Sequence, residues 1–286
     1  MRALAELIMK GRTHATIVAV LSVGTVFFAW IGAAAIALVT LRKGIHHGLV
    51  ILMWAVLPAL AVAFWGDTGP LGMVVGSALV AVVLRSLVSW PWALVTACVS
   101  GLLTSVGLLT IGHGVLTRVL DILKDMLMQL SSSQQSGVAV EQVLPTAIEF
   151  AGLLGLNNAF AVTGCVMLAR WWQALLYNPG GFGEEFRGLR MPPVLTIVLL
   201  AAALGLSAIG PDYRYWAITV AVPMVIAGFA LVHATARARN IGGGWLALFY
   251  GGWLLLDPLK IGLFLLAVAD SWINFRGRFV KRRDQD

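Results

Sequence analysis

Charged residues are scarce in this sequence. Asp, Glu, Lys and Arg together make up 12% of its 286 residues, whereas 59% of the residues are hydrophobic. A soluble globular domain carries roughly 25% charged residues, so this charge cannot cover the surface of a water-soluble protein of this size. The scarcity of charge excludes a soluble globular domain and indicates a polytopic integral membrane protein.

Cysteine and the common catalytic motifs are also almost absent. Cys98 and Cys165 both lie inside apolar runs, which indicates neither a disulfide framework nor a CxxC site. No two histidines stand at metal-ligand spacing with a carboxylate on one helix. GxSxG, HExxH and Walker motifs do not occur. We therefore expect no catalytic residue, no metal site and no cofactor, and a protein that is not an enzyme.

Long apolar runs are what the sequence does contain. They cover residues 14–41, 49–65, 71–88, 92–111, 143–176, 194–209, 217–234 and 245–272. The runs are continuous and rich in Leu, Ala and Val, without the alternation of a barrel strand. Since only helices and closed barrels satisfy their backbone groups in lipid, we predict an all-α transmembrane bundle of about 7–9 membrane segments.

We expect one membrane domain, 1–286, with three polar or amphipathic parts. Residues 1–12 predict a short amphipathic helix on the membrane surface, and residues 113–142 predict an amphipathic interfacial helix followed by a loop. Residues 274–286 form a basic tail, expected in the cytoplasm. The apolar run after the amino end continues to Leu41, so we interpret it as a retained segment and not as a cleaved signal peptide.

The net charge is +7, and part of the positive charge lies in short connections between the runs. In a membrane protein, basic connections mark the cytoplasmic side and contact anionic lipid, so we expect a lipid bilayer as partner and no nucleic acid. The basic connections lie around Arg42, Arg85, 187–190 and 237–239. Alternation of the runs places all four on the cytoplasmic side.

Both termini are basic as well, but single passes of the first and last runs would place both of them outside the cytoplasm. Each is about 28 residues long, or ~42 Å of helix, which exceeds a ~30 Å bilayer core. We predict breaks at Ser22–Gly24 and Asp257–Pro258, because two hairpins would return both termini to the cytoplasm. The alternative is two long tilted spans that violate the positive-inside rule.

Four polar residues inside the apolar runs are candidates for ligand binding: Asn157, Asn158, Asp257 and Lys260. Charges at membrane depth are costly and mark substrate or ion paths. Each pair also has a structural alternative. The asparagines can form interhelical hydrogen bonds. Asp257 and Lys260 stand three residues apart and can neutralise each other at a water-facing hairpin tip.

The segment Leu175–Pro193 is polar and rich in glycine. Its GGFGEE stretch is not GxGxxG and follows a helix instead of a strand, which excludes a nucleotide fingerprint. Asn178–Gly180 predicts a turn, and Pro192–Pro193 predicts a helix start. The charged residues beyond what a turn needs are Glu184, Glu185, Arg187 and Arg190. We expect them to form a docking surface for other membrane subunits; the alternative is a simple connection.

Three stretches of the sequence are distinctive: ARWWQALLYNPGGFGEEFRGLRMPP (169–193), the amino end MRALAELIMKGR and ADSWINFRGR (269–278). They resemble proteobacterial members of the DUF2232 family, which includes YybS-like integral membrane proteins. The resemblance implies a bacterial inner (cytoplasmic) membrane location. It also implies a distant similarity to the substrate-binding subunits of energy-coupling-factor transporters, and hence a compact bundle with a small-molecule cavity. Because the similarity is one of fold, no catalytic residues follow from it.

These features favour a non-catalytic, transporter-like membrane protein that binds a small molecule within its helical bundle. The alternative is a membrane scaffold or assembly partner in the cell envelope, acting through the charged segment and through small-residue faces such as Gly72 and Gly76, which are spaced as GxxxG.

Overall fold

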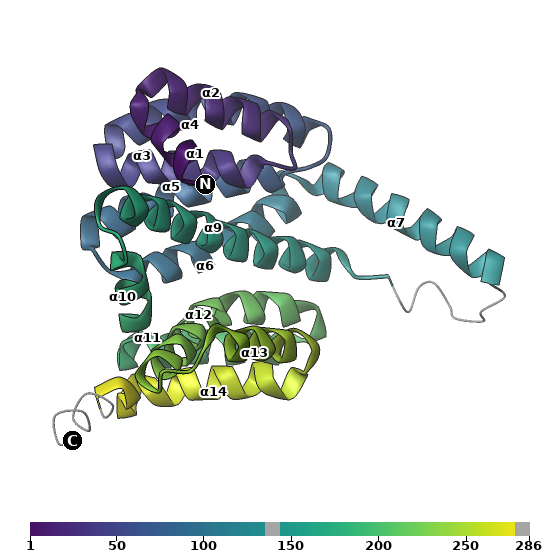
Figure 1. The fold of residues 1–286 in the computed structure, drawn as a ribbon. Helices are drawn as coiled ribbons and strands as arrows, with labels where there is room; N and C mark the ends of the chain where they lie inside the picture. The colour runs from purple at the N-terminus through teal and green to yellow at the C-terminus, as the bar shows by residue number, and fades with distance from the viewer. Residues whose placement is uncertain (135–143, 278–286) are drawn as a thin grey trace.

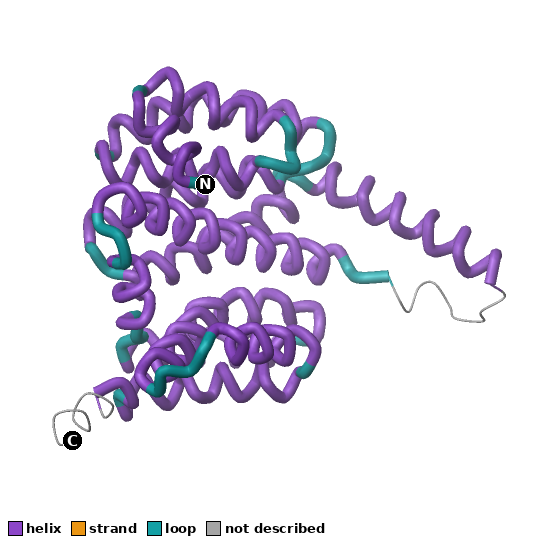
Figure 2. The backbone as a smooth tube through the Cα atoms, viewed as in Figure 1, coloured by secondary structure: helices purple, strands orange, loops and turns teal. Residues whose placement is uncertain are grey.

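The structure is a computed structural model that describes residues 1–134 and 144–277 of the chain. The described residues form helices joined by short turns and contain no strand (Figures 1 and 2). This confirms the predicted all-α helical bundle.

The helices are, in chain order, α1 (Arg2–Lys10), α2 (Arg12–Gly24), α3 (Ala29–Lys43), α4 (Ile45–Phe64), α5 (Gly69–Leu87), α6 (Trp90–Thr110), α7 (His113–Gln134), α9 (Ala147–Tyr177), α10 (Gly181–Gly188), α11 (Pro193–Ile209), η1 (Pro211–Tyr213), α12 (Arg214–Ala238), α13 (Gly243–Leu255) and α14 (Asp257–Ile273).

Among the described residues, five helical segments are long and apolar enough to cross a membrane singly: α4, α5, α6, α9, and η1 with α12. Two bent pairs, α10 with α11 and α13 with α14, raise the number to seven if each pair is one span. The chain is therefore a multi-pass membrane protein with somewhat fewer spans than the predicted 7–9. One reason is that α2 and α3 have 13 and 15 residues, fewer than a span needs.

The first apolar run is a hairpin of these two short helices. α2 ends at Gly24, Val26 adopts a positive φ of 55°, and α3 begins at Ala29 (Figure 1). The break predicted at Ser22–Gly24 is therefore confirmed, a few residues further along the chain.

The last apolar run is also broken where the sequence predicts it. α13 ends at Leu255 and α14 begins at Asp257, with an angle of 111° between the two helices. Pro258 lies in the first turn of α14, where its missing N–H removes no intrahelical hydrogen bond.

The core of the bundle surrounds α3 and α9. Eleven of the 15 residues of α3 are buried, many of them alanine, and α3 packs against α2, α4, α5 and α9. α9 lies between α3 on one side and α12 on the other (Figure 1). Its residues Val162 and Val166 belong to the first hydrophobic cluster, whereas Leu156 and Ala159 belong to the second. α9 therefore joins the two parts of the bundle.

The two predicted amphipathic segments behave differently. α1 packs its apolar side against the bundle, where Ala5 and Ile8 are completely buried, so this face is not free to lie on a lipid surface. α7 extends away from the other helices (Figure 1), with Ile122 61% and Met126 56% exposed. An open apolar side suits the predicted interfacial helix. Residues 135–142 of the predicted segment lie outside the described part of the chain.

Basic residues gather at one end of the bundle, which we call the basic end. Its members are Arg42, Lys43, Arg85, Arg170, Arg190 and Arg276. Lys43 Nζ donates to the Met9 carbonyl at the end of α1, at 3.2 Å. Arg190 Nε donates to the Asp270 carbonyl near the end of α14, at 2.8 Å. The two hairpins thus bring both terminal helices to the same end.

α6 and α9 approach each other through two facing glycines. A Cβ atom added to Gly101 would lie 2.5 Å from the Gly155 carbonyl oxygen. One added to Gly155 would lie 2.5 Å from the Gly101 carbonyl oxygen and 2.0 Å from Ser105 Oγ. Neither position has room for a side chain unless the two helices move apart.

We expect Gly155→Ala to lower the stability of the protein by about 1–3 kcal/mol, the usual cost of overpacking. The measurement is the midpoint of thermal unfolding in detergent. Gly164→Ala on the same helix is the matched control, because an added Cβ there meets nothing within 4 Å. It should leave the midpoint unchanged or raise it. Equal midpoints for the two variants would show that α6 and α9 are not in close contact.

Candidate functional site

A cavity of about 280 Å³ lies between the α4–α5 connection, α6, α7 and α9. We call it the asparagine cavity because Asn157 and Asn158 both line it. Most of its wall is apolar and comes from Met73, Leu108, Val115, Leu116, Val119, Phe150, Leu154 and Ala161. An apolar wall with few polar groups is typical of small-molecule sites, and the volume is just below their usual range of roughly 300–1,000 Å³.

Asn158 is fixed by two hydroxyl groups of α6. Its Nδ2 donates to Ser100 Oγ at 3.3 Å and to Thr104 Oγ1 at 3.0 Å. Ser100 and Thr104 are four residues apart and therefore lie on the same face of α6. The predicted interhelical hydrogen bonds are confirmed for Asn158, but they use only one end of the amide.

The other end of the Asn158 amide, Oδ1, is buried and has no hydrogen-bond partner among the described residues. It lies against α5, where a Cβ added to Gly72 would be 2.9 Å away. Asn157, one residue earlier, is exposed. The two neighbouring amides therefore differ: one is held inside the bundle, and the other has an open side chain.

Gly72 and Gly76 serve packing within this protein. A Cβ added to Gly76 would lie 2.4 Å from Ser100 Oγ and 2.6 Å from Val162 Cγ2. These glycines therefore let α5 approach α6 and α9. Their GxxxG spacing does not form an outer face for a partner.

Asp257 and Lys260 lie elsewhere, at the start of α14. Lys260 Nζ contacts Asp257 Oδ1 at 2.8 Å, and their side chains are 42% and 84% exposed, respectively. Neither residue lines the asparagine cavity. The structure thus brings together two of the four predicted ligand residues, and the other two form the self-neutralised pair that was their structural alternative.

The segment Leu175–Pro193 is only partly a loop. The predicted turn is present, with Gly180 at φ 89°, and α11 begins at Pro193 as predicted. Between them, however, residues 181–188 form the short helix α10. Phe182 and Phe186 are four residues apart on α10, with Phe182 beside Trp90 and Phe186 beside His233. These aromatic contacts hold α10 against the bundle and explain why a glycine-rich stretch is helical.

Two of the four charged residues predicted for docking are used within the molecule. Glu185 pairs with Arg170: Nε donates to Oε2 at 2.9 Å, and Nη2 donates to Oε1. Trp90 Nε1 also donates to Glu185, at 3.4 Å. Glu184 is exposed and Arg187 is half-buried. Glu185 and Arg190 therefore make contacts that hold the fold, whereas a docking role for the four residues stays a prediction.

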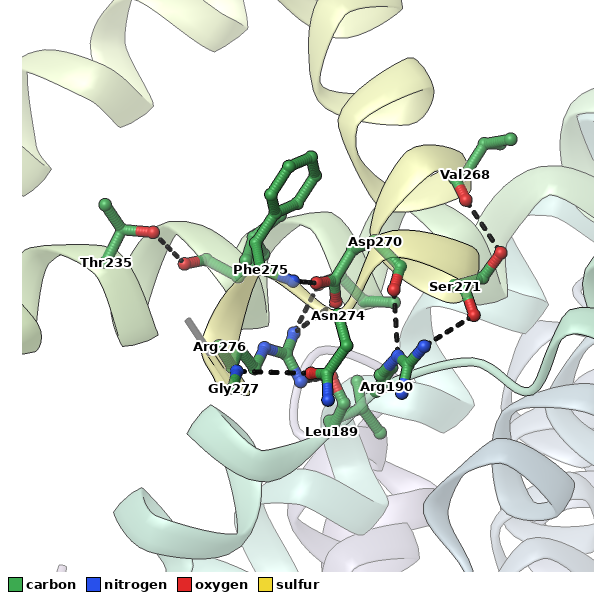
Figure 3. A network of polar contacts seen from close by, with 12 residues as sticks. Leu189, Arg190, Thr235, Val268, Asp270, Ser271, Asn274, Phe275, Arg276 and Gly277 are labelled. Atoms are coloured by element: carbon green, nitrogen blue, oxygen red, sulfur yellow. Dashed lines mark hydrogen bonds and ion pairs between the residues drawn. The ribbon is translucent and has the colours of Figure 1, made fainter. Parts of the chain in front are cut away.

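Arg190 ties the α10–α11 connection to the end of α14 (Figure 3). Its Nε and Nη2 donate to the carbonyls of Asp270 and Ser271, at 2.8 and 2.7 Å. Arg276 returns the contact by donating to the Leu189 carbonyl, and it forms an ion pair with Asp270 at 3.6 Å. Burial lowers the pKa of Arg276; Asp270 raises it, and Arg190 lowers it further.

A larger pocket of about 660 Å³ opens at the basic end. We call it the arginine pocket because Arg85, Arg170 and Arg190 line it, together with Ser89, Trp90 and Glu185. The sequence analysis marks Arg85 as a topology signal and Arg190 as part of the predicted docking surface, and it predicts none of the three arginines as a ligand-binding residue. The sequence feature that could have indicated this pocket is that several basic connections are predicted on one side of the membrane.

The described residues contain no group of three or more His, Cys, Asp or Glu placed to hold a metal ion. The chain matches no protein-family model, no curated protein and no solved structure. The DUF2232 resemblance stays a prediction.

We expect Glu185→Gln to loosen α10, because it weakens a two-bond contact between charged groups. A partly exposed pair of this kind contributes about 1 kcal/mol, or roughly fivefold faster amide hydrogen exchange across residues 181–188. Glu184→Gln is the matched control, since it removes the same charge from an exposed neighbour. If both variants exchange at the wild-type rate, the Arg170–Glu185 contact does not hold α10 in place.

Proposed function

We propose that this protein is a non-catalytic, transporter-like membrane protein that binds a small molecule in the asparagine cavity. The observation that carries the proposal is the buried Asn158 Oδ1, which lacks a donor among the described residues although Asn158 lines a cavity. An unsatisfied buried acceptor costs about 1–3 kcal/mol. A turn of the Asn158 side chain that brings Oδ1 to the cavity would let a ligand N–H or O–H group donate to this atom and remove that cost.

The lining of the cavity limits the class of ligand. Its one charged residue is Asp67, whose Oδ1 accepts from the Gly69 N–H at 2.9 Å. Thr104 and Asn157 add neutral polar groups. A carboxylate at the mouth disfavours an anion, so the expected ligand is a small neutral or amine-bearing molecule with an apolar body.

The position of the cavity in the bundle supports uptake. It lies at the α4–α5 connection and the start of α7, whereas the basic end lies at the α5–α6 connection, at the opposite ends of α5 and α6. The positive-inside rule assigns the basic end, and with it both termini, to the cytoplasm. On this assignment, in a bacterial inner membrane, the cavity opens on the outer side. Active transport would then depend on partner subunits.

The scaffold alternative is favoured by a different observation, the open apolar side of α7 with Ile122 and Met126 exposed. The features that first suggested it now support it less, because Gly72 and Gly76 pack internally and Glu185 and Arg190 hold the fold. A membrane partner that is lost when Ile122 and Met126 are changed to serine would favour this function over ligand binding.

We expect the wild-type protein to retain a small molecule through purification, and Asn157→Leu to reduce its amount about tenfold. The exposed position of Asn157 spares the fold, and an apolar side chain there fills the cavity mouth. Tenfold corresponds to about 1.4 kcal/mol, or one good hydrogen bond. The measurement is mass spectrometry of the extracted compounds against empty lipid particles.

The control is the double variant Asp257→Asn, Lys260→Met, which changes the two predicted ligand residues outside the cavity. It should retain the compound at the wild-type level. An equal loss in both variants would contradict binding in the asparagine cavity, and so would a wild-type protein that carries no compound above background.

A further inference from the structure

The arginine pocket carries a charge that the contacts of the bundle do not neutralise. Three arginines and one glutamate line it, a net charge of +2. Arg170 and Glu185 form the two-bond pair described above, and Arg170 Nη1 also donates to Gln173 at 2.7 Å. The pair is therefore internally balanced. The surplus positive charge belongs to Arg85 and Arg190.

Both of these arginines keep unused hydrogen-bond donors. Arg85 donates through Nη1 to the carbonyls of Thr40 and Leu41, which leaves its Nε and Nη2 without a hydrogen bond to any described residue. Arg190 donates through Nε and Nη2, which leaves its Nη1. Each guanidinium group is thus held in place by helix-end carbonyls and still presents donors.

The wall between them adds to the positive potential. The pocket includes Val88, Ser89, Trp90 and Pro91, which form the α5–α6 connection and the first turn of α6. α6 has 21 residues, and the Ser89 side chain does not cap its first turn. Pro91 has no N–H, but the other free N–H groups of this helix start, with the helix dipole, attract anions. This effect adds to the field of the two arginines and does not define the site without them.

The hydrogen-bond donors of the pocket are guanidinium groups, and this indicates which kind of anion it binds. Guanidinium groups bind phosphate oxygens with paired, charge-assisted hydrogen bonds, and arginine is over-represented at such sites. The volume of about 660 Å³ exceeds what inorganic phosphate fills and lies within the usual range for organic ligands. We propose that the arginine pocket binds the phosphate group of a phospholipid headgroup or of a soluble organic phosphate, through Arg85 and Arg190.

The arginine pocket is separate from the asparagine cavity, which lies at the other end of α5 and α6 and disfavours anions. Phosphate binding in the arginine pocket would also affect the stability of the bundle. Arg85 holds the end of α3, and Arg190 holds the end of α14. A phosphate bound by both arginines links the first and last parts of the bundle, so binding should raise thermal stability.

The test uses the full chain in maltoside detergent micelles, which contain no phosphate, in a phosphate-free buffer, and has two arms. In the first, the thermal midpoint is compared between micelles without phospholipid and micelles with added phosphatidylglycerol. In the second, glycerol 3-phosphate is titrated onto protein in micelles without phospholipid. We expect the midpoint to rise in at least one arm. A rise with phosphatidylglycerol alone assigns the lipid headgroup, and a rise with glycerol 3-phosphate alone assigns the soluble ligand. No rise in either arm overturns the proposal.

The double variant Arg85→Gln, Arg190→Gln keeps N–H donors for the helix-end carbonyls but removes both charges. In this variant, the ligand concentration that gives half of the rise in thermal midpoint should be at least tenfold higher. Arg42→Gln is the matched control, because Arg42 lies at the same basic end, over the Tyr177 ring at 4.0 Å, and does not line the pocket. An equal loss in Arg42→Gln would assign the effect to diffuse surface charge and overturn the proposal. If the double variant does not fold, Arg85→Gln alone gives the same comparison.

Discussion

Close approach of helix backbones is the constraint on which the rest of this molecule depends. Lipid tails are as apolar as the side chains they would replace, so helices in a bilayer associate through packing and hydrogen bonds. Gly101 and Gly155 bring α6 and α9 together, and Gly72 and Gly76 bring α5 to both of them. The hydroxyls of Ser100 and Thr104 reach Asn158 only because the backbones are this close.

A second principle operates at the basic end, where arginines bind the last carbonyl groups of helices. Arg85 contacts the end of α3, and Arg190 contacts the end of α14. These carbonyls lie in the last turns of their helices, at the negative end of the helix dipole, so a cation is favoured there. The Thr40 and Asp270 carbonyls also accept from the backbone N–H groups of Gly44 and Asn274. The residues that mark membrane topology in the sequence therefore also hold the bundle together.

Much of the fold could be predicted from the sequence, because it follows from local rules. Apolar runs gave the helices, and the positions of Gly24 and Pro258 gave the two breaks. What could not be predicted depends on contacts between distant segments. The sequence predicts Glu185 as a charged residue of an exposed connection, whereas in the fold it accepts hydrogen bonds from Arg170. Asp257 and Asn157 are both polar residues within apolar runs, yet only the asparagine lines the cavity.

The short first hairpin has a consequence for the membrane itself. α2 has 13 residues and measures ~20 Å, about two thirds of a ~30 Å hydrocarbon core. The turn at its tip satisfies much of its own backbone, with Val26 N–H donating to Val23 and Thr25 Oγ1 donating to Ser22, and Phe27 beside them is 88% exposed. Such a tip suits a position inside lipid. With its tip in lipid, this hairpin would be thinner than the bilayer around it, and the lipids there would tilt or shorten to meet Phe27.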